Sequence, residues 1–156
     1  MGWDDLTGKE ERGSVMGTKE YDVVCVGLAV GNVVVRPVSE KIFEVDTIQV
    51  DEIAMMCGGD ALNQSSVLAS LGHKVALISK VSDDSSGNMI LQELEHKGVD
   101  TSYVAMDDRI GTSNCIVLVQ ENGQRSFCTF KGCLRNFGKC DIDFSLVEKA
   151  RIVSIG

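Results

Sequence analysis

The residues best suited to binding chemistry lie between Cys57 and Gly72, in the stretch CGGDALNQSSVLASLG. Gly58 and Gly59 stand directly before a segment whose apolar residues have helical spacing, and Asn63 follows one turn later. The first N–H groups of a helix have no partner within the helix, and residues without side chains let a ligand touch that backbone. The Asn63 amide can donate and accept hydrogen bonds at the same place. This pattern predicts a binding site at the start of a helix.

Asp60 indicates which kind of ligand fits this site. A carboxylate repels a phosphate but accepts hydrogen bonds from hydroxyl groups, so the stretch favours a polyol over a nucleotide phosphate. A simpler interpretation stays open, in which the two glycines only form a tight turn between a strand and a helix.

Other motifs narrow the possible functions. The segment GLAVGN lacks the G-x-G-x-x-G of dinucleotide-binding proteins, and the sequence contains no G-x-x-x-x-G-K-[ST] phosphate loop. Asp83 and Asp84 could form a metal-binding pair, but a helix cap is the favoured interpretation. His73 and His96 are expected at the surface, and the six cysteines form no C-x-x-C pair, so no metal site is predicted.

Composition excludes two classes of partner. A formal net charge of -8 with no basic stripe argues against nucleic-acid binding. No apolar run approaches the roughly 20 residues of a membrane-spanning helix. The polar N-terminus does not resemble a secretory signal, so we expect a cytoplasmic protein with reduced thiols.

The hydrophobic pattern predicts alternating strands and helices. Apolar runs at residues 21–27 and 73–81 are typical of strands buried in a parallel sheet, and helices are expected between them and after the second. Residues 33–57 and 112–131 mix charged and β-branched residues, so we expect them to pair as a small antiparallel flap beside the sheet. Residues 1–19 are predicted to be a disordered tail.

The run RIVSIG at residues 151–156 is predicted to be another strand of the parallel sheet. No helix follows it in the sequence, and an uncovered apolar edge is a feature that folded proteins avoid. We therefore expect residues 20–156 to be the N-terminal part of a larger domain.

Three separated blocks resemble one family in order and spacing. GGDALNQSSVLASLG, VALISKVSDDSSGNMILQELEHKGVDTSYV and IVLVQENGQRSF are similar to the ribokinase (PfkB) family of sugar and nucleoside kinases. The resemblance implies a ribokinase-like α/β fold: a doubly wound, mostly parallel sheet flanked by helices, with a small β-sheet lid made of segments 33–57 and 112–131. It also implies transfer of the ATP γ-phosphoryl group, with Mg²⁺, to a sugar hydroxyl.

The resemblance also implies roles for individual residues. Gly58, Gly59 and Asn63 match residues that bind sugar hydroxyls in the family, and Asp60 lies in the same motif. Asn32 stands where the family usually has an aspartate that holds the sugar, which leaves the substrate open.

The second signature of the family, Gly-Ala-Gly-Asp, carries the catalytic base and does not occur in these 156 residues. No catalytic residue is therefore assigned here; the catalytic aspartate and most of the ATP site are expected beyond Gly156, and the chain alone is expected to be inactive. The alternatives are a non-catalytic sugar-binding fragment, a module that dimerises through the lid, and a nucleoside kinase of the same family.

Overall fold

The computed structural model describes residues 19–156, so the predicted tail lies outside the described residues except for Lys19. Within residues 19–156 the structure has eight strands and three α-helices. The elements are β1 (Tyr21–Val26), β2 (Val30–Arg36), β3 (Glu52–Gly58), α1 (Asp60–Ser70), β4 (Val75–Ser82), α2 (Ser85–His96), β5 (Val104–Asp107), β6 (Asn114–Val119), β7 (Arg125–Phe130), α3 (Phe144–Glu148) and β8 (Ala150–Ile155). Short 3₁₀ turns lie at Glu40–Phe43, Gly132–Asn136 and Lys139–Asp141.

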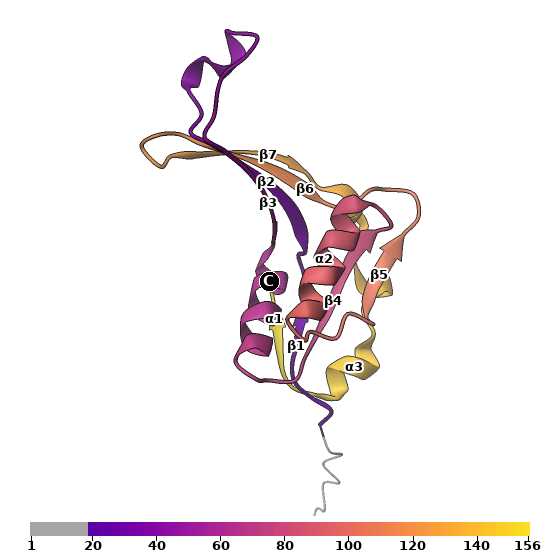
Figure 1. Cartoon of the computed structure of the whole chain (residues 1–156). Helices are drawn as coiled ribbons and strands as arrows, with labels where there is room; N and C mark the ends of the chain where they lie inside the picture. The colour runs from indigo at the N-terminus through magenta and orange to yellow at the C-terminus, as the bar shows by residue number, and fades with distance from the viewer. Residues whose placement is uncertain (1–18) are drawn as a thin grey trace, which may run out of the picture.

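Four strands form a parallel sheet in the order β5-β4-β1-β8. Its centre is β1, where Val23 pairs with Val75 of β4 and with Ile152 of β8. Helices α1 and α2 cover one face, and α3 lies against the other (Figure 1). The predicted parallel α/β architecture is confirmed.

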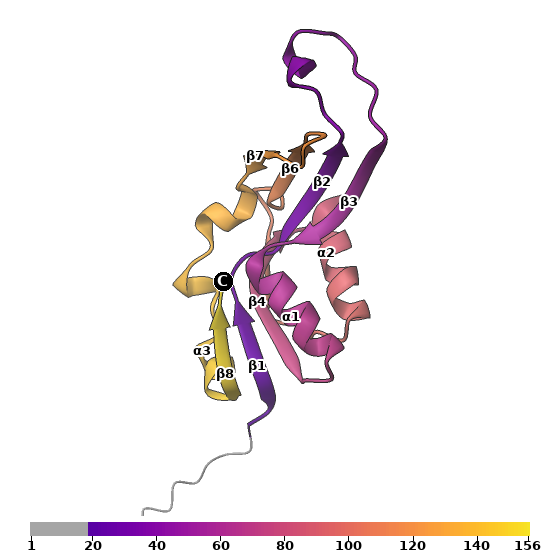
Figure 2. The ribbon, with the colours of Figure 1, turned by 90° about the vertical axis from the view of Figure 1, so that its left-hand side faces the viewer.

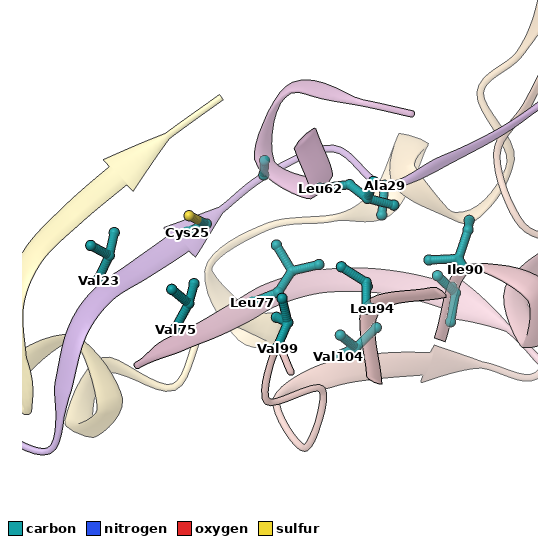
Figure 3. Close-up of a cluster of buried hydrophobic side chains, with 12 residues drawn as sticks. Val23, Cys25, Ala29, Leu62, Val75, Leu77, Ile90, Leu94, Val99 and Val104 are labelled. Atoms are coloured by element: carbon teal, nitrogen blue, oxygen red, sulfur yellow. The ribbon is translucent and has the colours of Figure 1, made fainter. Parts of the chain in front are cut away.

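The core consists of two hydrophobic clusters, one on each face of this sheet. Cys25 and Leu77, both fully buried, belong to the cluster under α1 and α2 and meet Leu62, Ile90 and Leu94 of the two helices (Figure 3). Alternate residues of the same strands point to the other side, where the cluster includes Val24, Ile78 and Leu146. Burial on both faces explains why these strands appear in the sequence as continuous apolar runs.

Glycines end the two long helices. Gly72 follows α1 with φ +88°, and Gly98 follows α2 with φ +82°, a conformation that favours glycine after a helix. No helix of residues 19–156 has the length and hydropathy needed to cross a membrane.

The second sheet has the order β3-β2-β6-β7, and we call it the lid sheet. It rises from the carboxyl edge of the parallel sheet and bends away from it (Figures 1 and 2). The two predicted ribbons do pair with each other, but the expectation of a purely antiparallel flap is wrong. Strands β2 and β6 are parallel because both run outward from the core and lie side by side, while β3 and β7 return on the outside.

Candidate functional site

The predicted glycine pair forms the turn between β3 and α1. Gly59 caps α1 with φ +101° and ψ 144°, and a Cβ atom there would lie 2.4 Å from the carbonyl oxygen of Leu28. The N–H of Leu62 donates to the same oxygen at 3.1 Å. The start of α1 is therefore fixed against the loop that follows β1, and only glycine fits at residue 59.

Gly58 makes room for the side chain of Asn32. A Cβ atom at residue 58 would lie 2.3 Å from Asn32 Nδ2. Asn32 lies in β2, paired with Met56 of β3, and is partly buried. Its amide atoms are not sealed from solvent, and no group within residues 19–156 hydrogen-bonds them. The structure thus brings Asn32 and Gly58 together and leaves the amide available to a ligand.

Asp60 and Asn63 lie in the first turn of α1, and both side chains are exposed. The N–H of Asn63 donates to the carbonyl oxygen of Gly59 at 2.9 Å, and Gly59 offers no side-chain cap. Asn63 also borders a hollow of about 490 Å³ between β3, α1 and α2. All five predicted site residues therefore lie near the carboxyl edge of the parallel sheet, where open α/β folds bind ligands.

Asp84 is a helix cap, as predicted, and it also anchors the lid sheet. Its Oδ1 accepts from the N–H of Gly87 in α2, and its Oδ2 accepts from the N–H of Thr112 just before β6, each at 2.8 Å. Burial alone would raise the pKa of Asp84, but the hydrogen bonds from Gly87 and Thr112 outweigh it and hold the pKa below its usual value. The link to Thr112 had no signal in the sequence, because it joins residues far apart in the chain.

A buried charge cluster lies at the carboxyl ends of β4 and β5. Lys80 Nζ lies 2.9 Å from Asp141 Oδ1 and 3.6 Å from Asp107 Oδ2, and all three side chains are largely buried. The hydrogen bond with Lys80 lowers the pKa of Asp141, and backbone N–H groups of Arg109 and Ile110 lower the pKa of Asp107. The cluster fastens the segment around Asp141 to the sheet.

The groups at the start of α1 and in β2 are suited to hydrogen-bonding a polar, uncharged ligand. These groups are the amides of Asn32 and Asn63, the carboxylate of Asp60 and the backbone at the start of α1. Within residues 19–156 no three His, Cys, Asp or Glu side chains are grouped closely enough to hold a metal ion. All six cysteines are free thiols.

Sequence comparison identifies the family. The profile of the pfkB family of carbohydrate kinases matches residues 21–156, the whole of the described fold apart from two residues. The chain belongs to this family. A deoxyribokinase of Salmonella typhi is 29% identical over 100 residues, which cover 64% of this chain and 33% of the relative. A ribokinase of Mus musculus is 30% identical over 110 residues, which cover 69% and 34%.

The fold comparison agrees with the sequence comparison. The structure of Arabidopsis thaliana ribokinase complexed with ribose and ATP superposes with a TM-score of 0.73 at 24% identity, over 86% of this chain and 45% of that one. The ribokinase-like fold is therefore confirmed. The pfkB-type chain spans about a third of the length of the curated relatives it matches.

Proposed function

We propose that this chain forms the sugar-binding side and the lid of an ATP-dependent carbohydrate kinase. The observation that carries the proposal is the absence of a side chain at Gly58. It leaves space for the Asn32 amide beside the start of α1, in a chain of the pfkB family. In this role the amides of Asn32 and Asn63 and the carboxylate of Asp60 hydrogen-bond sugar hydroxyls. Gly58 and Gly59 let the sugar approach the backbone.

The reaction of the whole enzyme is transfer of the ATP γ-phosphoryl group to a sugar hydroxyl. Stabilising the transferred group requires positive charge or backbone N–H donors around it and a base for the attacking hydroxyl. The described residues do not fit a site for ATP with Mg²⁺: the site holds an acidic side chain, Asp60, and no cluster of metal-binding groups lies within residues 19–156. We place the ATP and Mg²⁺ ligands and the catalytic aspartate outside these residues, in a cytoplasmic enzyme.

The binding role is tested by calorimetric titration of pentoses and hexoses into the product of the complete reading frame that contains this chain. Asn63→Ala and Asn32→Ala are each expected to weaken the binding of the preferred sugar by about 1 kcal/mol or more. Asn88→Ala, which removes an exposed asparagine from α2, is the matched control and should bind like the unchanged protein. Equal binding by Asn63→Ala and the control would remove Asn63 from the site.

The phosphorylation activity of residues 1–156 can be measured separately from sugar binding. Residues 1–156 alone are expected to show no ATP-dependent phosphorylation of a sugar that the complete protein phosphorylates, in a coupled assay for ADP. Sustained turnover by this chain alone would contradict the assignment of the catalytic groups to other residues. Titration of nucleosides in parallel distinguishes the alternative of a nucleoside kinase.

A second role is favoured by the surface of the lid sheet. Three apolar side chains on one of its faces are well exposed: Ile53 (66%), Met55 (63%) and Ile116 (45%). Contiguous exposed apolar groups mark interaction surfaces, so we also propose that the lid dimerises with a second copy. Sedimentation velocity of the complete protein tests this, because Met55→Glu should then shift a dimer toward monomer.

A further inference from the structure

The two faces of the lid sheet differ in what they can contact. Toward α2, Gly31 packs against Ser86, whose hydroxyl lies 2.7 Å from Asn114 Oδ1, and the Cys57 thiol lies over α2. Because side chains alternate along a strand, the residues next to these point the other way. That second face looks away from α2, toward the side on which the chain ends at Gly156 (Figures 1 and 2).

One row of four residues crosses this second face beside the glycine turn. Register places Met56 opposite Asn32, Asn32 opposite Cys115, and Cys115 opposite Thr129. The Cys115 thiol and the Thr129 hydroxyl lie 3.3 Å apart, which confirms that both point to this face. We call these four residues the lid row; it carries the Asn32 amide near the glycine turn and the Thr129 hydroxyl on the outermost strand.

The rest of this face is apolar or already paired. The next row outward contains Ala54, Val34, Val117 and Phe127. Beyond it, the Arg36 guanidinium binds Glu52 through two hydrogen bonds of 2.8 and 2.6 Å, and Arg125 lies over the ring of Phe127. The Asn32 amide and the Thr129 hydroxyl are therefore the uncharged polar groups that the lid row offers to a ligand.

We propose that Thr129 is a specificity-determining residue that contacts an uncharged sugar at its end farthest from Asn32. This inference rests on the proposed function. Asn32 and Thr129 lie two strand spacings apart, about 10 Å, so a sugar held by Asn32 reaches Thr129 with a substituent on its far side. Thr129 is exposed, and its hydroxyl can both donate to and accept from a sugar hydroxyl there. A site that hydrogen-bonds a hydroxyl discriminates against the analogue that lacks it.

The test compares Thr129→Val with the unchanged protein, using the product of the complete reading frame and calorimetric titration. The ligands are the preferred sugar and its single-deoxy analogues. Thr129→Val keeps the shape but removes the hydroxyl, and should weaken the binding of the parent sugar about two- to tenfold. The analogue that lacks the contacted hydroxyl should bind Thr129→Val and the unchanged protein with the same affinity.

Two further variants separate contact from structure. Thr129→Ser keeps the hydroxyl and should restore the affinity for the parent sugar. Ser126→Ala removes a hydroxyl from the same strand on the opposite face and should change nothing. Urea unfolding of each variant reports whether the lid remains folded.

The outcomes separate this inference from the proposed function. Equal weakening of every sugar, failure of Thr129→Ser to restore affinity, or the same loss in Ser126→Ala would overturn the role of Thr129. If Asn32→Ala weakens sugar binding and Thr129→Val does not, the proposed function stands and this inference fails. If the unchanged protein binds no sugar of the panel, both fail.

Discussion

Replacing Gly58 with alanine should damage binding while leaving the fold intact. The new Cβ would lie 2.3 Å from Asn32 Nδ2, so the flexible end of Asn32 must rotate away. Holding that side chain off its preferred rotamer costs about 0.5–1.5 kcal/mol. The backbone at Gly58 has no positive φ, so alanine also gains about 0.4–1 kcal/mol by restricting the unfolded chain. The free energy of unfolding should therefore change by less than about 1 kcal/mol.

Binding should change more, because the Asn32 amide leaves the place that faces a ligand. Losing one or two hydrogen bonds costs about 1–3 kcal/mol, which raises the Kd of a bound sugar roughly 5- to 140-fold. The matched variant is Gly59→Ala, at a φ of +101° and with a Cβ 2.4 Å from a backbone oxygen that cannot rotate away. It should lose about 3 kcal/mol of stability or more.

Both variants are measured by urea unfolding and by titration with sugar. Gly58→Ala should lower the affinity for sugar with little change in the free energy of unfolding. Gly59→Ala should lower the free energy of unfolding much more than Gly58→Ala does. A Gly58→Ala protein as unstable as Gly59→Ala would show that residue 58 is only a packing position. Unaltered affinity in a folded Gly58→Ala protein would show that Asn32 does not face the ligand.

Three further predictions concern stability, each measured by urea unfolding. Ser66→Ala should stabilise the protein by about 1 kcal/mol, because the Ser66 hydroxyl is buried and has no hydrogen-bond partner among residues 19–156; destabilisation would mean that it is bonded. Asp84→Ala should cost about 2–3 kcal/mol by releasing the start of α2 and the base of the lid, and a cost below 0.5 kcal/mol would refute this anchor. Lys80→Met should destabilise the protein at pH 7, because Asp107 and Asp141 lose the cation that they share. The pKa values of these two carboxyls are lowered in the folded protein, so their contribution is present above the unfolded pKa near 4 and disappears as pH falls through the folded values. The difference in the free energy of unfolding between Lys80→Met and the unchanged protein should therefore become smaller below about pH 4. A difference independent of pH would contradict the charge pairing.

The parallel core was predictable because its signals are local. The run at Tyr21–Val26 is apolar on both faces, and glycines at 72 and 98 mark the ends of α1 and α2. The turn at Gly58 and Gly59 before α1 was also predictable, since a glycine pair before a helix has a direct physical meaning; that it binds a ligand stays a prediction. The sequence could not show that the two glycines have different roles. Gly59 is required by its positive φ and by the nearby backbone of Leu28, whereas Gly58 makes room for the side chain of Asn32.

The lid was harder to predict because its pairing depends on where the strands leave the core. Hydrophobic alternation identified both ribbons, yet it does not reveal that β2 lies parallel to β6. The same limit applies to the anchor between Asp84 and Thr112 and to the contact between Cys115 and Thr129. Each joins residues that are distant in sequence or on separate strands, so only the register of the folded sheet brings them together.

The electrostatics at the start of α1 favour the uncharged part of a substrate. A helix N-terminus carries a partial positive charge of about half an elementary charge, which normally attracts anions. Here the first helical residue is Asp60, whose carboxylate opposes that partial charge in the same turn. A phosphate approaching Gly59 would therefore meet net repulsion, whereas a hydroxyl could donate to the Asp60 carboxylate. Asp60→Asn should accordingly weaken the preference for a neutral sugar over its phosphorylated form, as measured by calorimetric titration of both.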